Sequence, residues 1–278
     1  MIFLITGGAG SLGRRLVKEL LKPKYKVDII RVLDHDENGL ARMQIRFKDP
    51  RIRIRYLLGD IRDKTRVERA MENVDVCIHC AAQKHVDLSE FNPFESIKSN
   101  VIGTQNCIEA ALTNKIDKFL FISSDKAVHA VGTYGRCKAL SESLTLDANN
   151  YKGDRRTKLS VARPPNYVNS DGSVFEIWKY QKSKGLPLTV TSEKMERFFM
   201  RFPKIIKFVM RSVEMMEGKE VFVPIGAEKM KIIDLARKIS DKIEIIGLRK
   251  GERLMEYLYT EEEIACAEQK DGLWVIKQ

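Results

Sequence analysis

The chain has 278 residues, of which 44% are apolar, and this length predicts one large domain, or a main domain with a smaller lobe, around a substantial core. No apolar run approaches the ~18 residues of a membrane span, and the opening MIFLIT is too short for a signal peptide, so we expect a cytoplasmic protein without a membrane span. The formal net charge of +11 is spread along the chain without a nucleic-acid motif, so a phosphate-rich small substrate or simple solubility accounts for it, and no nucleic-acid partner is expected.

Apolar, strand-like runs alternate with amphipathic stretches as far as Arg163. Segment 94–113 is the clearest helix, because apolar residues recur on one face at helical spacing. Such alternation with short loops predicts a parallel sheet covered on both faces, a Rossmann-type doubly wound α/β fold. The predicted strands are 2–6, 27–33, 53–58, 75–80, 118–122 and 158–162, and the predicted helices are 11–22, 38–47, 64–72, 94–113 and 134–149.

Three glycines, Gly7, Gly10 and Gly13, lie between the first strand and the first helix, with Ser11 and Leu12 among them. Glycines permit a tight turn and let a pyrophosphate approach the backbone N–H groups at the start of a helix. An ordinary tight turn between a strand and a helix is the alternative. The position of the glycines at the start of the chain predicts a dinucleotide site.

Acidic residues close the next two predicted strands. Asp34 can accept hydrogen bonds from an adenosine ribose, which favours NAD, whereas the nearby His35 and Arg42 would favour NADP. A helix-capping acid is the alternative for Asp34. Asp60 and Ile61 follow the third strand and are predicted to contact the adenine ring, with a turn before a capped helix as the alternative. We therefore expect NAD or NADP, with a slight preference for NAD.

The fourth predicted strand contains Cys77 and Cys80 in C-x-x-C spacing, but the chain has no second such pair. Residues three apart on a strand point to opposite faces, and the odd, scattered set of five cysteines argues against disulfides. We therefore expect core cysteines and no metal site. The loop that follows has small side chains that allow close approach of a cofactor, and then polar ones. From this part of the chain the predicted ligand contacts are Ala81, Ala82, Lys84, His85 and, on the following helix, Asn100.

The fifth strand leads to Ser124, Asp125 and Lys126, and the next helix places Tyr134 and Lys138 one turn apart. The ammonium of Lys138 is expected to lower the pKa of Tyr134 from its usual value near ~10. Such a tyrosine can take a proton from an alcohol while a cofactor takes a hydride. A surface tyrosine and lysine on an amphipathic helix are the alternative.

After Arg163 the turn-rich segment PPNYVNSDG ends the alternation. Short helices are predicted near 173–183, 203–217 and 231–239, and short strands near 220–223 and 243–246. We therefore predict a dinucleotide-binding domain over residues 1–163 and a smaller C-terminal substrate-binding lobe over residues 164–278, the two sharing a cleft.

These motifs resemble the extended short-chain dehydrogenase/reductase superfamily and, within it, the inverting UDP-N-acetylglucosamine 4,6-dehydratases. The similarity extends over nearly the whole chain, through the segments AAQKHVDLSEFNPFESIKSNVIGTQN, SSDKA, YGRCK, FVPIGAEKMKIIDLA and IIGLRKGERLMEYL. Its most specific part is Asp-Lys-Ala ahead of Tyr-x-x-x-Lys, because retaining sugar dehydratases typically carry glutamate at the position of Lys126. The resemblance implies a lyase with tightly bound NAD(P), a UDP-sugar substrate and a homo-oligomer.

By this resemblance Tyr134 starts oxidation at C4 of the sugar, with Lys138 beside it. Lys126 then removes the C5 proton, and Asp125 protonates the departing C6 hydroxyl. Tyr134 returns a proton to C5 from the opposite face, which inverts that centre, and the hydride returns to C6. Ser124 stands where the family carries threonine and is expected to contact the C4 oxygen. A solvated charge pair in a turn at the strand end is the alternative for Asp125 and Lys126.

The family usually reads Arg-Tyr-Gly-Asn where this chain has two prolines between Arg163 and Asn166. The prolines fix φ and remove two N–H donors. The guanidinium of Arg249 can form a bidentate contact with a diphosphate, and the alternative is that Arg249 is an ordinary surface arginine. Segment MERFFMRFPKIIKFVMR could be a surface helix, but Pro203 favours a lobe core with one phosphate-facing arginine, Arg197. The predicted substrate contacts in the lobe are Asn166, Ser173, Val174, Arg197, Arg249 and Glu252.

Two other functions remain open. A nucleotide-sugar C4 epimerase needs the tyrosine but not Asp125 and Lys126. An NAD(P)-binding scaffold, impaired at the proline pair, would bind the cofactor without turnover.

Overall fold

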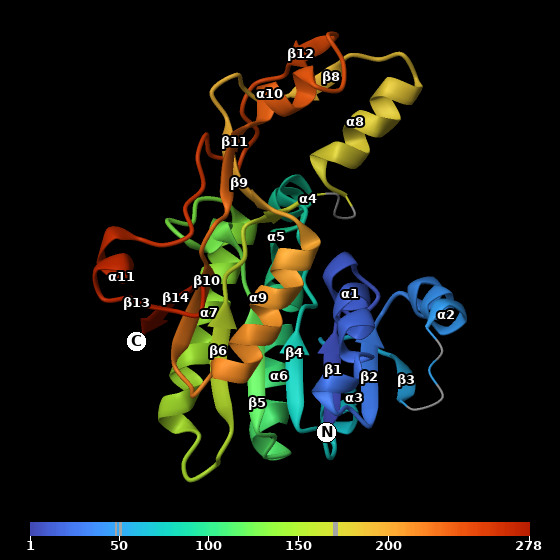
Figure 1. The fold of residues 1–278 in the computed structure, drawn as a ribbon, viewed down its shortest axis with the longest axis vertical. Helices are drawn as coiled ribbons and strands as arrows, with labels where there is room; N and C mark the ends of the chain where they lie inside the picture. The colour runs from blue at the N-terminus through green and yellow to red at the C-terminus, as the bar shows by residue number, and fades with distance from the viewer. Residues whose placement is uncertain (48, 50–51, 169–171) are drawn as a thin grey trace.

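The computed structural model describes residues 1–47, 49, 52–168 and 172–278. Its centre is a nine-stranded sheet with the order β13-β14-β10-β6-β5-β4-β1-β2-β3 (Figure 1). The strands from β10 to β3 in this order are parallel, and β14 and β13 are antiparallel additions at one edge. The strands are β1 (Ile2–Thr6), β2 (Ile29–Asp34), β3 (Arg53–Leu58), β4 (Val76–His79), β5 (Lys118–Ile122), β6 (Lys158–Ala162), β10 (Glu220–Pro224), β13 (Glu268–Lys270) and β14 (Leu273–Lys277).

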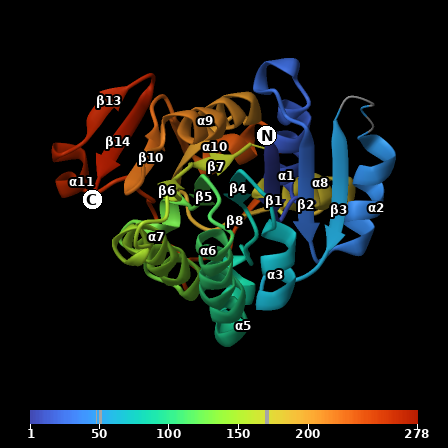
Figure 2. The same cartoon turned by 90° about the horizontal axis from the view of Figure 1, so that it is seen from below.

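Helices cover both faces of this sheet, as the view in Figure 2 shows. One face carries α1 (Ser11–Leu20), α2 (Glu37–Arg46) and α9 (Phe202–Met215), and the other carries α3 (Lys64–Met71), α6 (Gly103–Thr113) and α7 (Thr133–Tyr151). Strand β5 shows why both faces are buried: Phe119 and Phe121 pack on the α6 side, and Leu120 and Ile122 on the α1 side. The predicted Rossmann-type architecture is confirmed.

A smaller lobe stands over the carboxyl ends of the parallel strands (Figure 1). It has its own apolar core around Trp178, Leu188 and Phe199. Its elements are β7 (Asn166–Tyr167), α8 (Val174–Ser183), β8 (Leu188–Val190), β9 (Glu196–Met200), β11 (Glu228–Lys231), α10 (Ile232–Arg237) and β12 (Ile243–Ile245). Strands β11, β9 and β7 form one small sheet, and β12 pairs with β8 in another.

Two elements that the sequence assigned to the lobe belong instead to the main sheet layer. Strand β10 pairs with β6, and α9 packs beside α1. Every residue of β10 is buried, as expected for an interior strand covered on both faces rather than a lobe edge. The chain therefore enters the lobe after β6, returns to the sheet at α9 and β10, enters the lobe again at β11, and returns to the sheet at β13 and β14.

The segment predicted as one helix over 94–113 is three consecutive pieces. These are α5 (Pro93–Ile97), a π-helical turn η2 (Lys98–Ile102) and α6. The predicted apolar face is buried at Thr104, Ile108 and Ala111, but Phe94 is 61% exposed. A π-turn arises where a helix takes an extra residue, often near functional sites, and this one contains Asn100.

The sequence reading missed several short elements. They are η1 (Pro23–Tyr25), α4 (Val86–Phe91), the 3-10 turn η3 (Asp125–Ala127), α11 (Glu261–Ala265), β7, β8, β9, β11, β13 and β14. Among the described residues, no helix combines the length and the apolar character that a membrane crossing requires.

Candidate active site

A cavity of about 880 Å³ follows the carboxyl ends of the parallel strands from β3 to β5. Gly7 has a φ of +63°, and a Cβ on it would lie 2.6 Å from backbone atoms of Ala81. A Cβ on Gly13 would lie 2.5 Å from the Cα of Gly8. Only glycines therefore let β1, α1 and the loop after β4 approach this closely. The predicted cofactor residues that line the cavity are Gly7, Gly10, Ser11, Leu12, Gly13, Asp34, Asp60, Ile61, Ala81, Ala82, Lys84, Tyr134 and Lys138.

Asp34 is buried at the end of β2 and lines this cavity. Its Oδ2 accepts a hydrogen bond from the backbone N–H of Ala9 at 2.9 Å, and its Oδ1 accepts one from Asp36 at 3.0 Å. The helix-capping acid is Asp36, which accepts from Gly39 at the start of α2. Asp34 thus joins the glycine loop to the wall where an adenosine ribose would lie.

The loop after β4 is held by Asn100, which does not line the cavity as predicted. Its Oδ1 accepts from the backbone N–H of Gln83 at 2.8 Å, and its Nδ2 donates to the carbonyl of the same residue at 2.9 Å. Its own carbonyl, freed in the π-turn, accepts from Ser141 and Thr104. The side-chain amide of Asn100 thus bonds to the backbone of Gln83 and holds this residue in place, and Gln83 does line the cavity.

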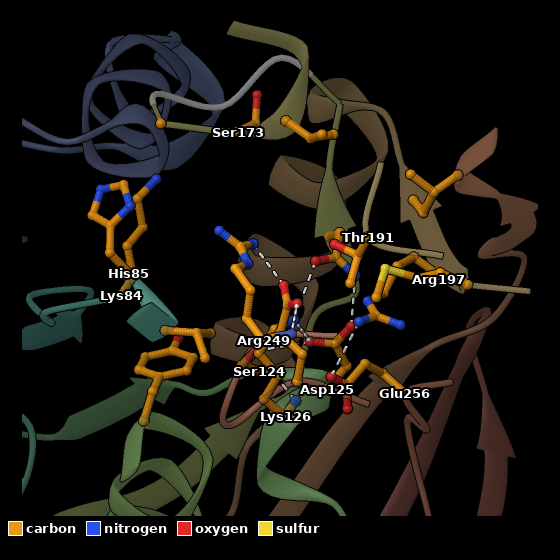
Figure 3. Close-up of a pocket in the computed structure, with 18 of the residues that line it drawn as sticks. Lys84, His85, Ser124, Asp125, Lys126, Ser173, Thr191, Arg197, Arg249 and Glu256 are labelled. Atoms are coloured by element: carbon orange, nitrogen blue, oxygen red, sulfur yellow. Dashed lines mark hydrogen bonds and ion pairs between the residues drawn. The ribbon is translucent and has the colours of Figure 1, made fainter. Parts of the chain in front are cut away.

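A second cavity, of about 370 Å³, lies between the sheet and the lobe. Residues on the wall common to both cavities are Lys84, His85, Ser123, Tyr134 and Tyr167. In Figure 3, Lys84 and His85 lie on one side, and Ser124, Asp125 and Lys126 lie together below Arg249. The predicted substrate residues Lys84, His85, Ser124, Asn166, Ser173, Val174, Arg197, Arg249 and Glu252 line this second cavity.

Asp125 and Lys126 form a compact polar cluster at the cavity floor. Asp125 is 1% exposed, and its Oδ1 lies 3.0 Å from Nζ of Lys126. The same oxygen accepts from the hydroxyl of Ser124 at 2.9 Å. Asn166 completes the cluster, since its Nδ2 donates to Asp125 Oδ2 at 2.6 Å and its Oδ1 accepts from Lys126 Nζ at 3.3 Å. A buried, fully hydrogen-bonded carboxylate differs from the solvated turn pair considered above.

Tyr134 begins α7 and is buried on the wall between the cavities. Burial raises the pKa of its phenol strongly, and a hydrogen bond with Ser124 opposes this only in part. The expected lowering by Lys138 is wrong for this structure. Nζ of Lys138 donates instead to the carbonyl of Ile122 at 2.7 Å, and burial lowers its pKa to about 8.

Ser123 is one of the residues on the wall common to the two cavities. Its side chain is buried, and its Oγ has no hydrogen-bond partner among the residues that the structure describes. An unpaired buried hydroxyl is costly unless a ligand or water satisfies it. The orphaned Oγ is therefore consistent with a ligand group at this junction, and a dinucleotide whose reactive end lies there fits the residues present.

The lobe arginines have partners that the sequence did not suggest. Arg197 donates to the carbonyls of Glu196, Arg253 and Leu254, which fastens the segment before Glu256 to β9. These donors are occupied by backbone, so the predicted phosphate-facing role does not fit this geometry. Arg249 pairs with Glu252 at 2.6 Å and approaches Asp87 of α4 at 3.7 Å, across the mouth of the cavity.

Arg163 is buried beside α7 rather than in the cavity. It forms ion pairs with Glu142 of α7 at 2.6 Å and with Glu263 of α11 at 2.8 Å. Burial alone would lower the pKa of this guanidinium, but the two carboxylates raise it overall. Pro164 and Pro165 then line the cavity and deliver Asn166 to Asp125.

Sequence reasoning missed one buried carboxyl in this cavity, Glu256. It is 3% exposed and lies 3.7 Å from Arg197, on the same side of the site as Asp125 (Figure 3). Burial raises the pKa of Glu256, and the charges of Lys126 and Asp125 act on it in opposite directions. The only sequence pattern that indicates a buried Glu256 is its position among the apolar residues of the segment GERLMEYL.

Comparison with known proteins gives the chain a family. A family model described as polysaccharide biosynthesis protein matches residues 3–278. The chain is 42% identical to a Methanocaldococcus jannaschii protein named as an uncharacterized membrane protein, over 98% of this chain and 84% of that protein. It is 40% identical to a Campylobacter jejuni UDP-N-acetylglucosamine 4,6-dehydratase (inverting), over 94% of this chain and 78% of the relative. A Rickettsia massiliae UDP-glucose 4-epimerase is 34% identical, over 95% and 79%.

Solved structures give the same fold. The X-ray structure of Pen from Bacillus thuringiensis has a TM-score of 0.94 and 34% identity, covering 100% of this chain and 88% of that one. A dTDP-glucose 4,6-dehydratase from Streptomyces venezuelae, DesIV, with NAD and TYD bound, has a TM-score of 0.83 at 22% identity, over 94% and 89%. At that identity the second likeness supports the fold alone.

Proposed function

Because this chain belongs to the polysaccharide biosynthesis protein family, we propose that it is a nucleotide-sugar 4,6-dehydratase, acting on UDP-N-acetylglucosamine with inversion at C5. The observation that carries this function is the Asp125–Lys126 pair in the same cavity as Tyr134. An oxidoreductase or an epimerase needs a tyrosine beside the cofactor but no second acid–base pair. A hydro-lyase needs both, because the oxidation at C4 only prepares the loss of water.

The larger cavity would hold NAD(P). Its glycine turn accepts a pyrophosphate at the start of α1, and Asp34 faces the ribose end. When bound, the nicotinamide supplies reversible hydride storage, from C4 of the sugar and back to C6. We propose NAD over NADP because Asp34 would repel a 2′-phosphate. His35 and Arg42, on the same wall, are the residues that would receive one.

Oxidation at C4 requires a proton acceptor at the junction of the two cavities. Tyr134 and Ser124 are positioned for this, and Ser124 connects the tyrosine to Asp125. Burial raises the pKa of this phenol, so only the fraction of the protein in which Tyr134 is ionised takes the O4 proton as the hydride departs. Lys138, with its pKa lowered to about 8, is poised to exchange protons near neutral pH behind the tyrosine.

Elimination then uses the polar cluster. Neutral Lys126 takes the C5 proton, which the adjacent ketone makes acidic, and protonated Asp125 gives its proton to the C6 oxygen as the C6–O bond breaks. One water leaves, and the C5–C6 double bond remains until a proton returns to C5 and a hydride to C6. The 3.0 Å contact between Lys126 and Asp125 lets the shared proton move to the acid before the step begins. Asn166 holds both groups throughout.

The test is incubation with UDP-N-acetylglucosamine in D₂O, followed by NMR of the product. We expect a 4-keto-6-deoxy sugar carrying deuterium at an inverted C5. If UDP-N-acetylgalactosamine is the only product, the protein is a C4 epimerase and the proposed dehydration is wrong. If the protein binds the cofactor but converts no UDP- or dTDP-hexose, it is an NAD(P)-binding scaffold without turnover. Titration with NAD and with NADP, compared between the native protein and Asp34→Asn, tests the cofactor preference.

We further propose a homo-oligomer that uses the surface of α4, α5 and η2. Apolar side chains there are exposed, including Phe91 at 85% and Phe94 at 61%. An apolar surface of this kind is unusual on a monomer. Light scattering of the native protein and of Phe91→Lys tests this: the native mass should exceed one chain, and the variant should dissociate.

A further inference from the structure

Helix α7, which carries Tyr134, begins without a capping side chain of its own. Its N-cap residue is Gly132, and the first hydrogen bond within the helix runs from the N–H of Arg136 to the carbonyl of Gly132. The backbone N–H groups before Arg136 therefore need partners from outside the helix. Thr133 has such a partner in Glu90 of α4, whose Oε1 accepts a hydrogen bond from the N–H of Thr133. Tyr134 is the next residue along the chain.

Two glycines leave room for the carboxylate of Glu90 at this helix start. A Cβ on Gly132 would lie 2.7 Å from the Cα of Gly251 and 2.8 Å from Oε1 of Glu90. A Cβ on Gly251, whose φ is +81°, would lie 3.1 Å from the same oxygen. A side chain at either position would therefore push the carboxylate away from α7 or displace the loop that contains Gly251.

The loop 249–253 contributes to the wall of the substrate cavity and lies against Glu90. Nζ of Lys250 in this loop is 3.5 Å from Oε2 of Glu90. Arg253, at the other end of the loop, donates to the carbonyl of His129 at 2.7 Å, in the segment that leads to α7. The loop therefore connects the wall of the substrate cavity with the start of α7.

The charge of Glu90 suits its place beside a helix N-terminus. The hydrogen bond from the backbone of Thr133 is the largest influence on the pKa of Glu90 and lowers it, whereas desolvation opposes this effect. A negative charge beside the first turn of a helix is stabilised by the helix dipole. The side chain of Lys250 is 83% exposed, and an exposed ion pair contributes little by itself. The hydrogen bond to Thr133 is therefore the contact that holds the helix start.

From these contacts we propose that Glu90 is a positioning residue for Tyr134: by capping α7 it holds the phenol in the place that oxidation at C4 requires. This rests on the proposed function, which assigns the O4 proton to Tyr134. Glu90 lines neither the cofactor cavity nor the substrate cavity, so it acts through the helix and not on the sugar. Such positioning matters because a misplacement of about 1 Å at a reacting group can lower a rate about a hundredfold.

The experiment isolates the oxidation step with an analogue of UDP-N-acetylglucosamine that lacks the C6 hydroxyl. The analogue has no water to lose, so the reaction stops once the C4 hydride is on the nicotinamide and the O4 proton is on Tyr134. Mixing it rapidly with the protein that holds NAD should raise the absorbance of reduced nicotinamide. The rate constant of this rise reports the oxidation step, and its amplitude reports the amount of competent protein.

We expect Glu90→Ala to lower this rate constant about tenfold or more, with the affinity for NAD unchanged. Glu90→Gln keeps an oxygen that can accept from Thr133, so it should recover most of the lost rate. Without cofactor, the backbone amides at the start of α7 should exchange hydrogen faster in Glu90→Ala than in the native protein. Glu193→Ala, in an exposed turn of the lobe outside both cavities, is the matched control.

An unchanged rate constant in Glu90→Ala would overturn the inference even if the amplitude falls, because a merely structural role lowers only the amount of folded protein. Glu90→Met, which also lacks an acceptor oxygen but is of similar length, replaces the alanine variant if a melting curve shows that one to be unfolded. If the native protein reduces no nicotinamide with the analogue or with UDP-N-acetylglucosamine, the proposed function is refuted instead. The two failures are distinguishable, because the first appears only in a variant and the second in the native protein.

Discussion

The side-chain amide of Asn166 donates a hydrogen bond to Oδ2 of Asp125 across 2.6 Å. It does so directly after two prolines that replace the residues usual in this family. The prolines lack N–H donors, but the contacts of this stretch with the site come from the asparagine side chain, which also reaches Lys126 and the carbonyl of Phe198. The altered loop therefore keeps its contacts with Asp125 and Lys126.

Removal of that connection should slow the elimination. We expect Asn166→Ala to lower kcat about tenfold or more, because a hydrogen bond to a charged group contributes about 1.5–3 kcal/mol. Asn166→Asp should be worse, since it adds a like charge beside Asp125. Steady-state rates of product formation measure both, with the exposed Gln44→Ala on α2 as control. Native-like kcat in Asn166→Ala would show that Asp125 and Lys126 are positioned without it.

Lys126 should be required for water loss but not for oxidation at C4. In Lys126→Ala we expect no dehydrated product and no deuterium at C5, while the absorbance of reduced nicotinamide rises on addition of substrate. The reason is that Tyr134 and Ser124, the residues proposed for the first step, are unchanged in this variant. Lys179→Ala, an exposed lysine on α8, is the control. Full dehydration by Lys126→Ala would refute its role as the base.

Arg163 should be a determinant of stability. We expect Arg163→Met to lower the free energy of unfolding by about 3–5 kcal/mol, because it leaves buried Glu142 and half-buried Glu263 without their partner. Denaturant unfolding measures this. Adding Glu142→Gln should recover part of the loss, since it removes one unpaired buried charge. A loss below about 1 kcal/mol would mean that water enters and solvates the carboxylates.

Acid should destabilise the fold through His79. This imidazole is fully buried between Thr6 and Thr104, which contact its two ring nitrogens at 2.6 and 3.1 Å. Burial lowers its pKa from 6.5 to about 3. Below pH 6.5 the unfolded chain therefore binds a proton that the folded chain does not.

The contribution of His79 to stability is thus complete above pH 6.5 and is lost as the pH falls toward about 3. The slope from this group is about 1.4 kcal/mol per pH unit. Unfolding curves between pH 7 and 4 for the native protein and for His79→Gln measure it, and the variant should lose less stability on acidification. The exposed His35→Gln is the control. Equal acid sensitivity in the native protein and His79→Gln would assign the effect to the carboxylates.

Much of the fold could be predicted from local patterns. Strands β1, β3, β5 and β6 have the predicted bounds, because short apolar runs between turn residues are typical of buried parallel strands. The prediction that strand β10 belongs to the lobe is wrong, because the apolar pattern of a buried strand does not show which sheet the strand joins. The π-turn that contains Asn100 is not predicted, because apolar residues keep a helical spacing in the segments on both sides of it.

The sequence by itself determined the chemistry that depends on neighbours in the chain: the glycine turn, the Asp125–Lys126 pair, and the spacing of Tyr134 and Lys138. Tertiary structure alone decided which polar groups face one another. Lys138 donates to the carbonyl of Ile122, Arg197 donates to the carbonyls of Arg253 and Leu254, and Glu256 lies 3.7 Å from Arg197. These partners are far apart in the chain, and burial forces each polar group to find whichever partner the packing brings within reach.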